Sequence, residues 1–340
     1  MTRWLGRIVV FVCVLVAGLA SAEAFARRMR PNWVLEVPAS RMGGLQLSQH
    51  DDLLGWVGRP HASGEMAIMG GEGAIPVRLN AWGLRGPLPA PGERPILLIG
   101  DSFTAGFDLD DTSTPARQLA ERTGRPVFPL AFPGYGTDQT FLLFRRVVVE
   151  QKLVEPAEVI YLFYKNDLLE NLMTRVYGHN KPYLRPTDDT PGWIAENVPV
   201  PKNKRPSLLA RSRLAVGIFP DAYTKRDARN RRADDERNEL DQFRFLLELL
   251  NREVASTGRR LKVLAVPPRD IVYGVAPPAQ VRLIEDAVKI CEAMDIPVRY
   301  PLAAFADHPN RDSLFLGDKT HWTADGTRLG VAEIMVMLDS

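Results

Sequence analysis

The sequence predicts an α/β protein, built in three layers on a doubly wound parallel sheet. From residue 95 onward, short apolar runs alternate with longer amphipathic segments. The runs are continuously apolar, as in strands buried on both faces, and their alternation with helices favours a parallel sheet. Polar turns containing glycine or asparagine follow the first three predicted strands. In such sheets the functional site lies outside the carboxyl ends of the strands.

The predicted elements alternate regularly along the chain. The segment 113–124 has a Ser/Thr start, a proline in its first turn and a glycine at its end, which are helix boundary signals. We expect the flavodoxin-like strand order 2-1-3-4-5, which places Pro129 in an edge strand, where proline is tolerated. The expected strands are 95–100, 127–132, 158–166, 261–267 and 296–301, and the expected helices are 113–124, 137–155, 238–256, 279–294 and 323–338.

The chain divides into three predicted parts. Residues 1–22 are a signal peptide or signal anchor, and residues 23–94 form an irregular, partly β segment rich in Gly and Pro. Residues 95–340 form the α/β domain, with an insertion at about 167–233 after the third strand. The insertion carries a basic stretch over 202–232. It is either a lid or substrate-binding cap over the active face, or a solvated basic loop.

The N-terminus has the pattern of an export signal. Arg3 and Arg7 precede an apolar run of 13 residues, and the Ala-Ser-Ala at 20–22 fits a cleavage site. A bilayer span needs about 20 residues. We therefore favour a cleaved signal peptide over a membrane anchor at residues 8–22. Either alternative predicts an exported protein, working on the periplasmic or extracellular face.

Composition narrows the classes of partner. The formal net charge is +2, which gives no case for nucleic-acid binding. The two cysteines are Cys13, inside the apolar run, and Cys291. This leaves neither a disulfide framework nor a cysteine metal site.

Three polar turns meet at one edge of the predicted sheet. Gly-Asp-Ser at 100–102 ends the first strand, a glycine-containing turn at 133–139 ends the second, and Lys-Asn-Asp at 165–167 ends the third. With the expected strand order, Ser102 and Asn166 border the crevice between strands one and three. Taken singly, each of these pieces could be an ordinary turn or helix cap.

A serine at this edge can act as a nucleophile if a base takes its proton. Of the five histidines, His321 lies directly before the last helix, with Asp318 three residues upstream. That spacing lets the carboxylate hold one imidazole nitrogen while the other faces Ser102. The backbone N–H groups of Ser102 and Gly134, together with the Asn166 amide, would supply an oxyanion hole.

These four blocks together resemble those of the SGNH (GDSL) hydrolase superfamily. The resemblance covers about 95–340, interrupted by the insertion. It implies a nucleophile at Ser102, a triad completed by Asp318 and His321, and oxyanion donors at Ser102, Gly134 and Asn166, with Gly136 as second choice for the glycine. Tyr164 departs from the pattern, since the family has glycine there.

The leading functional prediction is an extracytoplasmic serine esterase of the carboxylesterase type, which needs no metal or organic cofactor. Its substrate would be a small-molecule, lipid or glycan acyl ester. An alternative is an O-acyltransferase that modifies a cell-surface polysaccharide with the same triad, because acceptor choice depends on pocket shape and water exclusion. A third is a non-catalytic binding module on a hydrolase scaffold. The N-terminal segment would allow membrane association.

Overall fold

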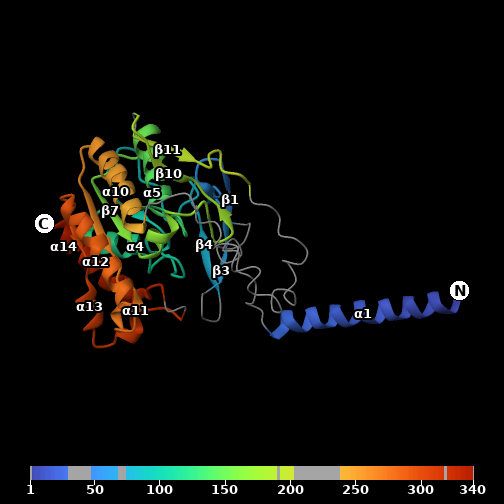
Figure 1. Ribbon diagram of the computed structural model, residues 1–340. Helices are drawn as coiled ribbons and strands as arrows, with labels where there is room; N and C mark the ends of the chain where they lie inside the picture. Colours follow the sequence, from blue (N-terminus) through green and yellow to red (C-terminus); the bar gives the residue numbers. More distant parts are fainter. Residues whose placement is uncertain are drawn as a thin grey trace.

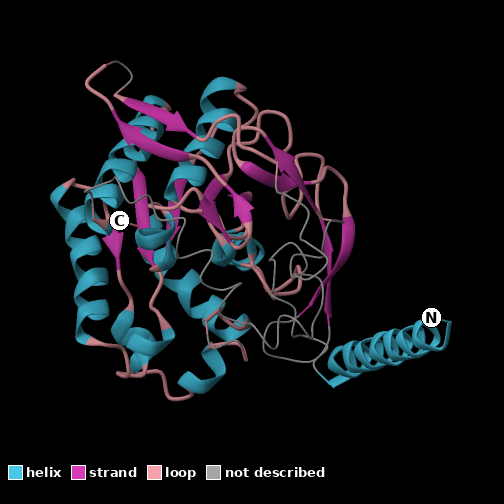
Figure 2. Ribbon diagram, turned by 45° about the vertical axis from the view of Figure 1, so that its right-hand side comes forward, coloured by secondary structure: helices cyan, strands magenta, loops and turns pink. Residues whose placement is uncertain are grey.

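A parallel sheet forms the centre of the molecule (Figures 1 and 2). The computed structural model describes residues 2–29, 47–67, 74–189, 192–202, 238–317 and 320–339. The sheet has the order β13-β12-β7-β5-β6, and every neighbouring pair is parallel. Its strands are β5 (Ile96–Gly100), β6 (Val127–Ala131), β7 (Glu158–Phe163), β12 (Leu261–Ala265) and β13 (Val298–Arg299). In chain order this is 2-1-3-4-5. The predicted fold is confirmed, with Pro129 on the edge strand β6.

Helices cover both faces of this sheet. Successive strand residues point to opposite faces, and they divide between two buried hydrophobic clusters. Leu97 and Ile99 pack with α5, α10 and α12, whereas Ile96 and Leu98 pack with α4 and α14. The bounds are α3 (Ser102–Ala105), α4 (Pro115–Thr123), α5 (Thr137–Phe144), α10 (Glu239–Ser256), α11 (Arg269–Val272), α12 (Pro278–Ala293), α13 (Leu302–Ala306), η3 (Arg311–Leu314) and α14 (Ala324–Leu338). Each fully buried aliphatic side chain contributes about 1.5–3 kcal/mol, so these clusters hold the three layers together.

One helix ends earlier than the sequence predicts. The segment 137–155 forms α5 and then a π-helix, η2 (Arg145–Glu150), which ends at Glu150. Lys152 has a φ of 52°, which is incompatible with a continuing helix. The residue before a proline also avoids helical backbone, and Pro156 follows closely. The predicted end at residue 155 is therefore wrong.

The segment before β5 folds against the α/β part. It contains two antiparallel pairs, β1 (Ser48–Asp51) with β2 (Gly55–Gly58), and β3 (Ser63–Ala67) with β4 (Ala74–Arg78). Trp56, Met66 and Val77 are buried in the same hydrophobic cluster as the sheet residues Leu97 and Ile99. The partly β segment thus shares a core with the α/β part.

The first part of the predicted insertion is regular structure. It begins with α6 (Asn166–Glu170), followed by two small antiparallel pairs, β8 (Arg175–Val176) with β9 (His179–Asn180), and β10 (Tyr183–Pro186) with β11 (Trp193–Glu196). Tyr183 and Leu184 are fully buried, so this part is packed onto the body. Residues 203–237, with nearly all of the basic stretch, lie outside the described residues, and the lid remains a prediction.

The N-terminal helix α1 (Thr2–Met29) lies apart from the sheet (Figure 1). Its apolar span, Gly6–Ala26, has 21 residues and is longer than the 13-residue run counted in the sequence. Within the described ranges it is the one helix that is long and apolar enough to cross a membrane, and a signal sequence has the same properties. The helix passes through the predicted cleavage site at 20–22.

Candidate active site

Ser102 stands on a sharp turn between β5 and α3. Gly100 has a φ of 143°, and a Cβ on it would lie 2.7 Å from the Leu162 carbonyl oxygen, so only glycine fits there. Asp101 then caps α3, because its Oδ1 accepts a hydrogen bond from the Phe103 N–H at 2.9 Å. Ser102 is the first residue of α3. The turn therefore places Ser102 at the carboxyl end of a central strand, and Asp101 shapes the turn.

His321 meets Ser102 across 219 positions of sequence. Its Nε2 lies 2.9 Å from Ser102 Oγ, which is hydrogen-bonding distance. The ring packs against Phe103 and Phe107, with centroids 5.1 and 5.0 Å away. The segment that carries it is fixed by the Leu316 N–H, which donates to the His321 carbonyl oxygen at 2.8 Å. A serine nucleophile and its base would need this arrangement.

Asp318, the predicted acid of the triad, lies outside the described residues. Its role as the partner of His321 remains a prediction.

The turn after β6 presents a free backbone donor. Gly134 has a φ of 79°, a left-handed conformation that favours glycine. The turn is held by Trp56, whose Nε1–H donates to the Pro133 carbonyl oxygen at 3.3 Å and whose own carbonyl oxygen accepts from the Tyr135 hydroxyl at 2.6 Å. Within the described residues, no hydrogen bond takes up the backbone N–H of Gly134 or Ser102. Both are available to an oxyanion.

Gly136 has a different structural role. It is the N-cap of α5, its φ is −83°, and a Cβ on it would lie 2.7 Å from Asn171 Oδ1. The conformation and the free N–H favour Gly134 as the oxyanion donor.

Asn166 is the first residue of α6 and follows β7 closely. The Glu170 carboxyl, one helical turn further on, accepts hydrogen bonds from the Asn166 amide and from the Tyr177 hydroxyl. The Tyr177 ring lies over Gly134, where an added Cβ would be 3.2 Å from it. Glu170 and Tyr177 thus orient the Asn166 amide and cover the glycine turn. Sequence reasoning missed both, since neither belongs to a block.

Tyr164, the residue that departs from the family pattern, is buried. Its ring packs on Phe103 with centroids 4.6 Å apart, and Phe103 in turn packs on His321. The larger side chain therefore supports the ring that contacts the histidine.

Several carboxyl groups are buried directly behind the site. Burial raises the pKa of Asp101 to about 6 and that of Glu170 to about 7. Burial, reinforced by the nearby Asp101 charge, raises the pKa of Asp167 well above its usual range, and Asp167 accepts a hydrogen bond from the Tyr161 hydroxyl at 2.7 Å. The buried cation among them is Lys181, which binds Asp138 and donates to the Glu170 carbonyl oxygen at 3.1 Å.

Glu170 is expected to make stability depend on pH. Its pKa is 4.5 without the fold and about 7 within it. The folded state therefore binds the proton more tightly, and the free energy of unfolding falls as pH rises from 4.5 to about 7. At about 1.36 kcal/mol per pKa unit, Glu170 contributes about 2–3 kcal/mol of this decline. Urea unfolding at pH 4.5 and pH 8 would measure it.

Glu170→Gln is expected to flatten that decline. The pKa of Asp101 is also raised by burial, so Asp101 adds to the decline of the unfolding free energy with pH. The Glu170→Gln variant therefore removes only one part of that decline. Lys181 and Tyr177 stay in place. An unchanged pH dependence in Glu170→Gln would contradict the assignment.

Arg85 connects the segment before β5 to α3 and to the loop that follows it. Its guanidinium is buried and donates to three carbonyl oxygens just after Ser102, those of Ala105, Gly106 and Leu109, the last at 2.8 Å. It also pairs with Asp111 at 2.6 Å. The fixed loop carries Phe107, which packs against His321. Nothing in the sequence RLNAWGLRG, which contains Arg78 and Arg85, indicated this role for Arg85.

Arg85→Lys is expected to destabilise the fold by about 1.5–3 kcal/mol. A single ammonium cannot replace the several contacts of the forked guanidinium, and a hydrogen bond to a charged group contributes about 1.5–3 kcal/mol. Chemical unfolding followed by tryptophan fluorescence measures the loss. Arg125→Lys, at an exposed position, is the matched control and should change stability by less than about 0.5 kcal/mol. Equal effects of the two substitutions would contradict the role.

Comparisons with known proteins give structural likenesses only. No family model matches the chain, and no curated protein matches it. Solved structures similar to it include a lipase/acylhydrolase from Enterococcus faecalis (17% identity, 72% of this chain and 95% of that one, TM-score 0.42). A lipolytic protein of the G-D-S-L family from Desulfitobacterium hafniense is 13% identical over 71% of this chain and 98% of that one, with a TM-score of 0.43.

An esterase from Pseudoalteromonas sp. is 11% identical over 73% of this chain and 97% of that one, with a TM-score of 0.40. The structural neighbours thus include members of the superfamily that the four sequence blocks resemble.

Proposed function

We propose that this chain is an SGNH-type serine esterase that hydrolyses acyl esters outside the cytoplasm. The observation that carries the proposal is the 2.9 Å contact between His321 Nε2 and Ser102 Oγ at the carboxyl edge of the sheet. Among the described residues, the backbone N–H groups of Ser102 and Gly134 have no hydrogen-bond acceptor, and they add a place for developing negative charge. The apolar helix α1 favours export or anchoring of the chain.

In the proposed reaction, His321 takes the proton of Ser102 as its oxygen attacks the ester carbonyl carbon. The N–H groups of Ser102 and Gly134 and the Asn166 amide hold the resulting oxyanion, each donor contributing about 3–4 kcal/mol. The intermediate collapses, and His321 gives its proton to the departing alkoxide. Water, activated by His321, then attacks the acyl-enzyme and releases the carboxylic acid and free Ser102. Asp318 is proposed to orient the imidazole.

A fluorophosphonate probe tests nucleophile activation without knowledge of the substrate. The full-length protein in detergent is treated with the probe, and peptides are mapped by mass spectrometry. We expect one phosphonyl adduct, on Ser102, and a much slower reaction in His321→Ala. An adduct elsewhere, or none, would overturn the proposal.

A further inference from the structure

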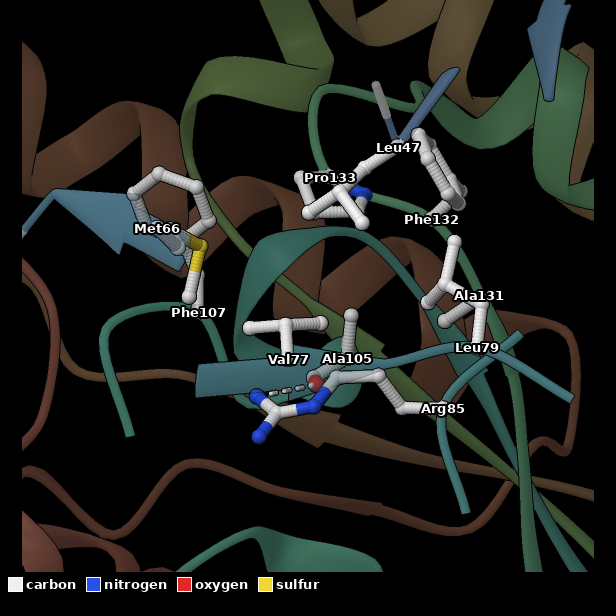
Figure 3. A pocket seen from close by; sticks show the side chains of 10 residues that line it. All are labelled: Leu47, Met66, Val77, Leu79, Arg85, Ala105, Phe107, Ala131, Phe132 and Pro133. Carbon is white, nitrogen blue, oxygen red and sulfur yellow. Dashed lines mark hydrogen bonds between the residues drawn. The ribbon is translucent and has the colours of Figure 1, made fainter. Parts of the chain in front are cut away.

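A small apolar cavity lies beside the proposed reaction centre. Its volume is about 30 Å³, and Figure 3 shows the side chains that line it. Three parts of the chain build it: the segment before β5, α3 with the loop after it, and the end of β6. Its lining residues are Leu47, Met66, Val77, Leu79, Arg85, Ala105, Phe107, Ala131, Phe132 and Pro133.

Three residues that line the cavity belong to elements of the predicted site or contact it. Ala105 belongs to α3, the short helix that Ser102 begins. Phe107 lines the cavity and also packs against the His321 ring. Pro133 lines it as well and directly precedes Gly134, the proposed oxyanion donor. Residues that contact or adjoin Ser102, His321 and Gly134 therefore also line this cavity.

The walls select an apolar group. Apart from Arg85, every lining side chain is aliphatic or aromatic or contains sulfur. The Nη atoms of Arg85 are taken up by the carbonyl oxygens after Ser102 and by Asp111, so its charge is already paired. Since a hydroxyl or charged group would lose hydrogen bonds to water here, the walls suit the hydrocarbon end of an acyl group better than a sugar alcohol.

The volume limits the length of that group. A cavity of about 10–15 Å³ already holds one water molecule, so about 30 Å³ leaves room for two or three groups of that size. Longer acyl chains would have to displace Met66, Val77 or Leu79, which are all buried. We propose that this cavity is the acyl pocket of the esterase, closed by the segment before β5, and that it restricts the enzyme to short acyl groups. The inference rests on the proposed function.

The test is a chain-length series with full-length protein. We expect kcat/KM for p-nitrophenyl acetate to exceed that for the octanoate by at least about tenfold, because one methylene in an apolar pocket already changes rates by 10- to 200-fold. Met66→Ala enlarges the cavity and should reduce this preference at least fivefold. Leu88→Ala is the matched control, since Leu88 is partly buried but lines a neighbouring cleft, and it should leave the preference unchanged.

Two further measurements keep the proposal falsifiable. If Met66→Ala does not fold, Ala131→Val narrows the pocket from the β6 side and should lower kcat/KM for the acetate. If no p-nitrophenyl ester is turned over, the labelling rates of a methyl- and an octylphosphonofluoridate give the same comparison on Ser102. The acyl-pocket proposal would be overturned if kcat/KM stayed constant or rose with acyl-chain length, or if Met66→Ala and Leu88→Ala had equal effects. In either case, labelling of Ser102 would still support the esterase. Absence of labelling would overturn the esterase itself.

Discussion

Replacing Ser102 with alanine is expected to lower kcat/KM for p-nitrophenyl acetate by a factor of about 10⁴–10⁶. The substitution removes the oxygen that lies 2.9 Å from His321 Nε2. His321→Ala should cost a similar factor, because a serine hydroxyl without its base is a weak nucleophile. The release of p-nitrophenol by each purified variant measures both effects.

The double variant gives the sharper result. Residues that act as one unit have strongly non-additive effects, so Ser102→Ala combined with His321→Ala should be little worse than either alone. Ser256→Ala, at the exposed end of α10, and His308→Ala, in a surface loop, are the controls and should keep full activity. Multiplied losses in the double variant would show that Ser102 and His321 do not work together.

Local sequence patterns were enough for the sheet, and His321 was chosen as the partner of Ser102 because a serine nucleophile needs a base, although 219 positions separate them. Continuous apolar runs and helix caps depend on neighbouring residues, and parallel strands necessarily bring their carboxyl ends to one edge. Ser102 and Asn166 therefore could be placed from their positions after β5 and β7. The early end of η2 was missed because apolar residues at helical spacing continue in the sequence beyond Glu150, where the helical backbone ends.

The supporting residues could not be predicted, since their partners are distant in sequence. Arg85 reaches carbonyl groups 20 to 24 positions away. The sequence suggests an exposed position for Lys181, a lysine directly before a proline. In the structure it is fully buried and pairs with Asp138, 43 positions away. Glu170 lies on a five-residue helix, which is too short for a hydrophobic repeat to indicate its buried face. Burial of a charge is decided by the packing of several elements together.

Lys181→Met is expected to destabilise the fold by about 3–5 kcal/mol, the cost of leaving a buried charge without its partner. Lys181 and Asp138 both have fully buried side chains. Burial already raises the pKa of Asp138, and the Lys181 charge is the largest of the effects that oppose that rise. Without Lys181, Asp138 must take up a proton or remain charged in an apolar interior. Urea unfolding followed by tryptophan fluorescence measures the loss.

The double variant Lys181→Met/Asp138→Leu should recover a large part of that loss, since an apolar pair of similar volume avoids burying either charge. Arg117→Met breaks the exposed ion pair with Glu121 on α4 and is the matched control, with an expected cost of less than about 1 kcal/mol. Lys181 also holds the Glu170 carbonyl at the end of α6, the helix that Asn166 begins. The rescued double variant should therefore regain stability but keep a lowered kcat. Full recovery of kcat in the double variant would mean that Lys181 contributes to stability alone. If Lys181→Met lowered the free energy of unfolding as little as Arg117→Met does, the buried pair would not stabilise the fold.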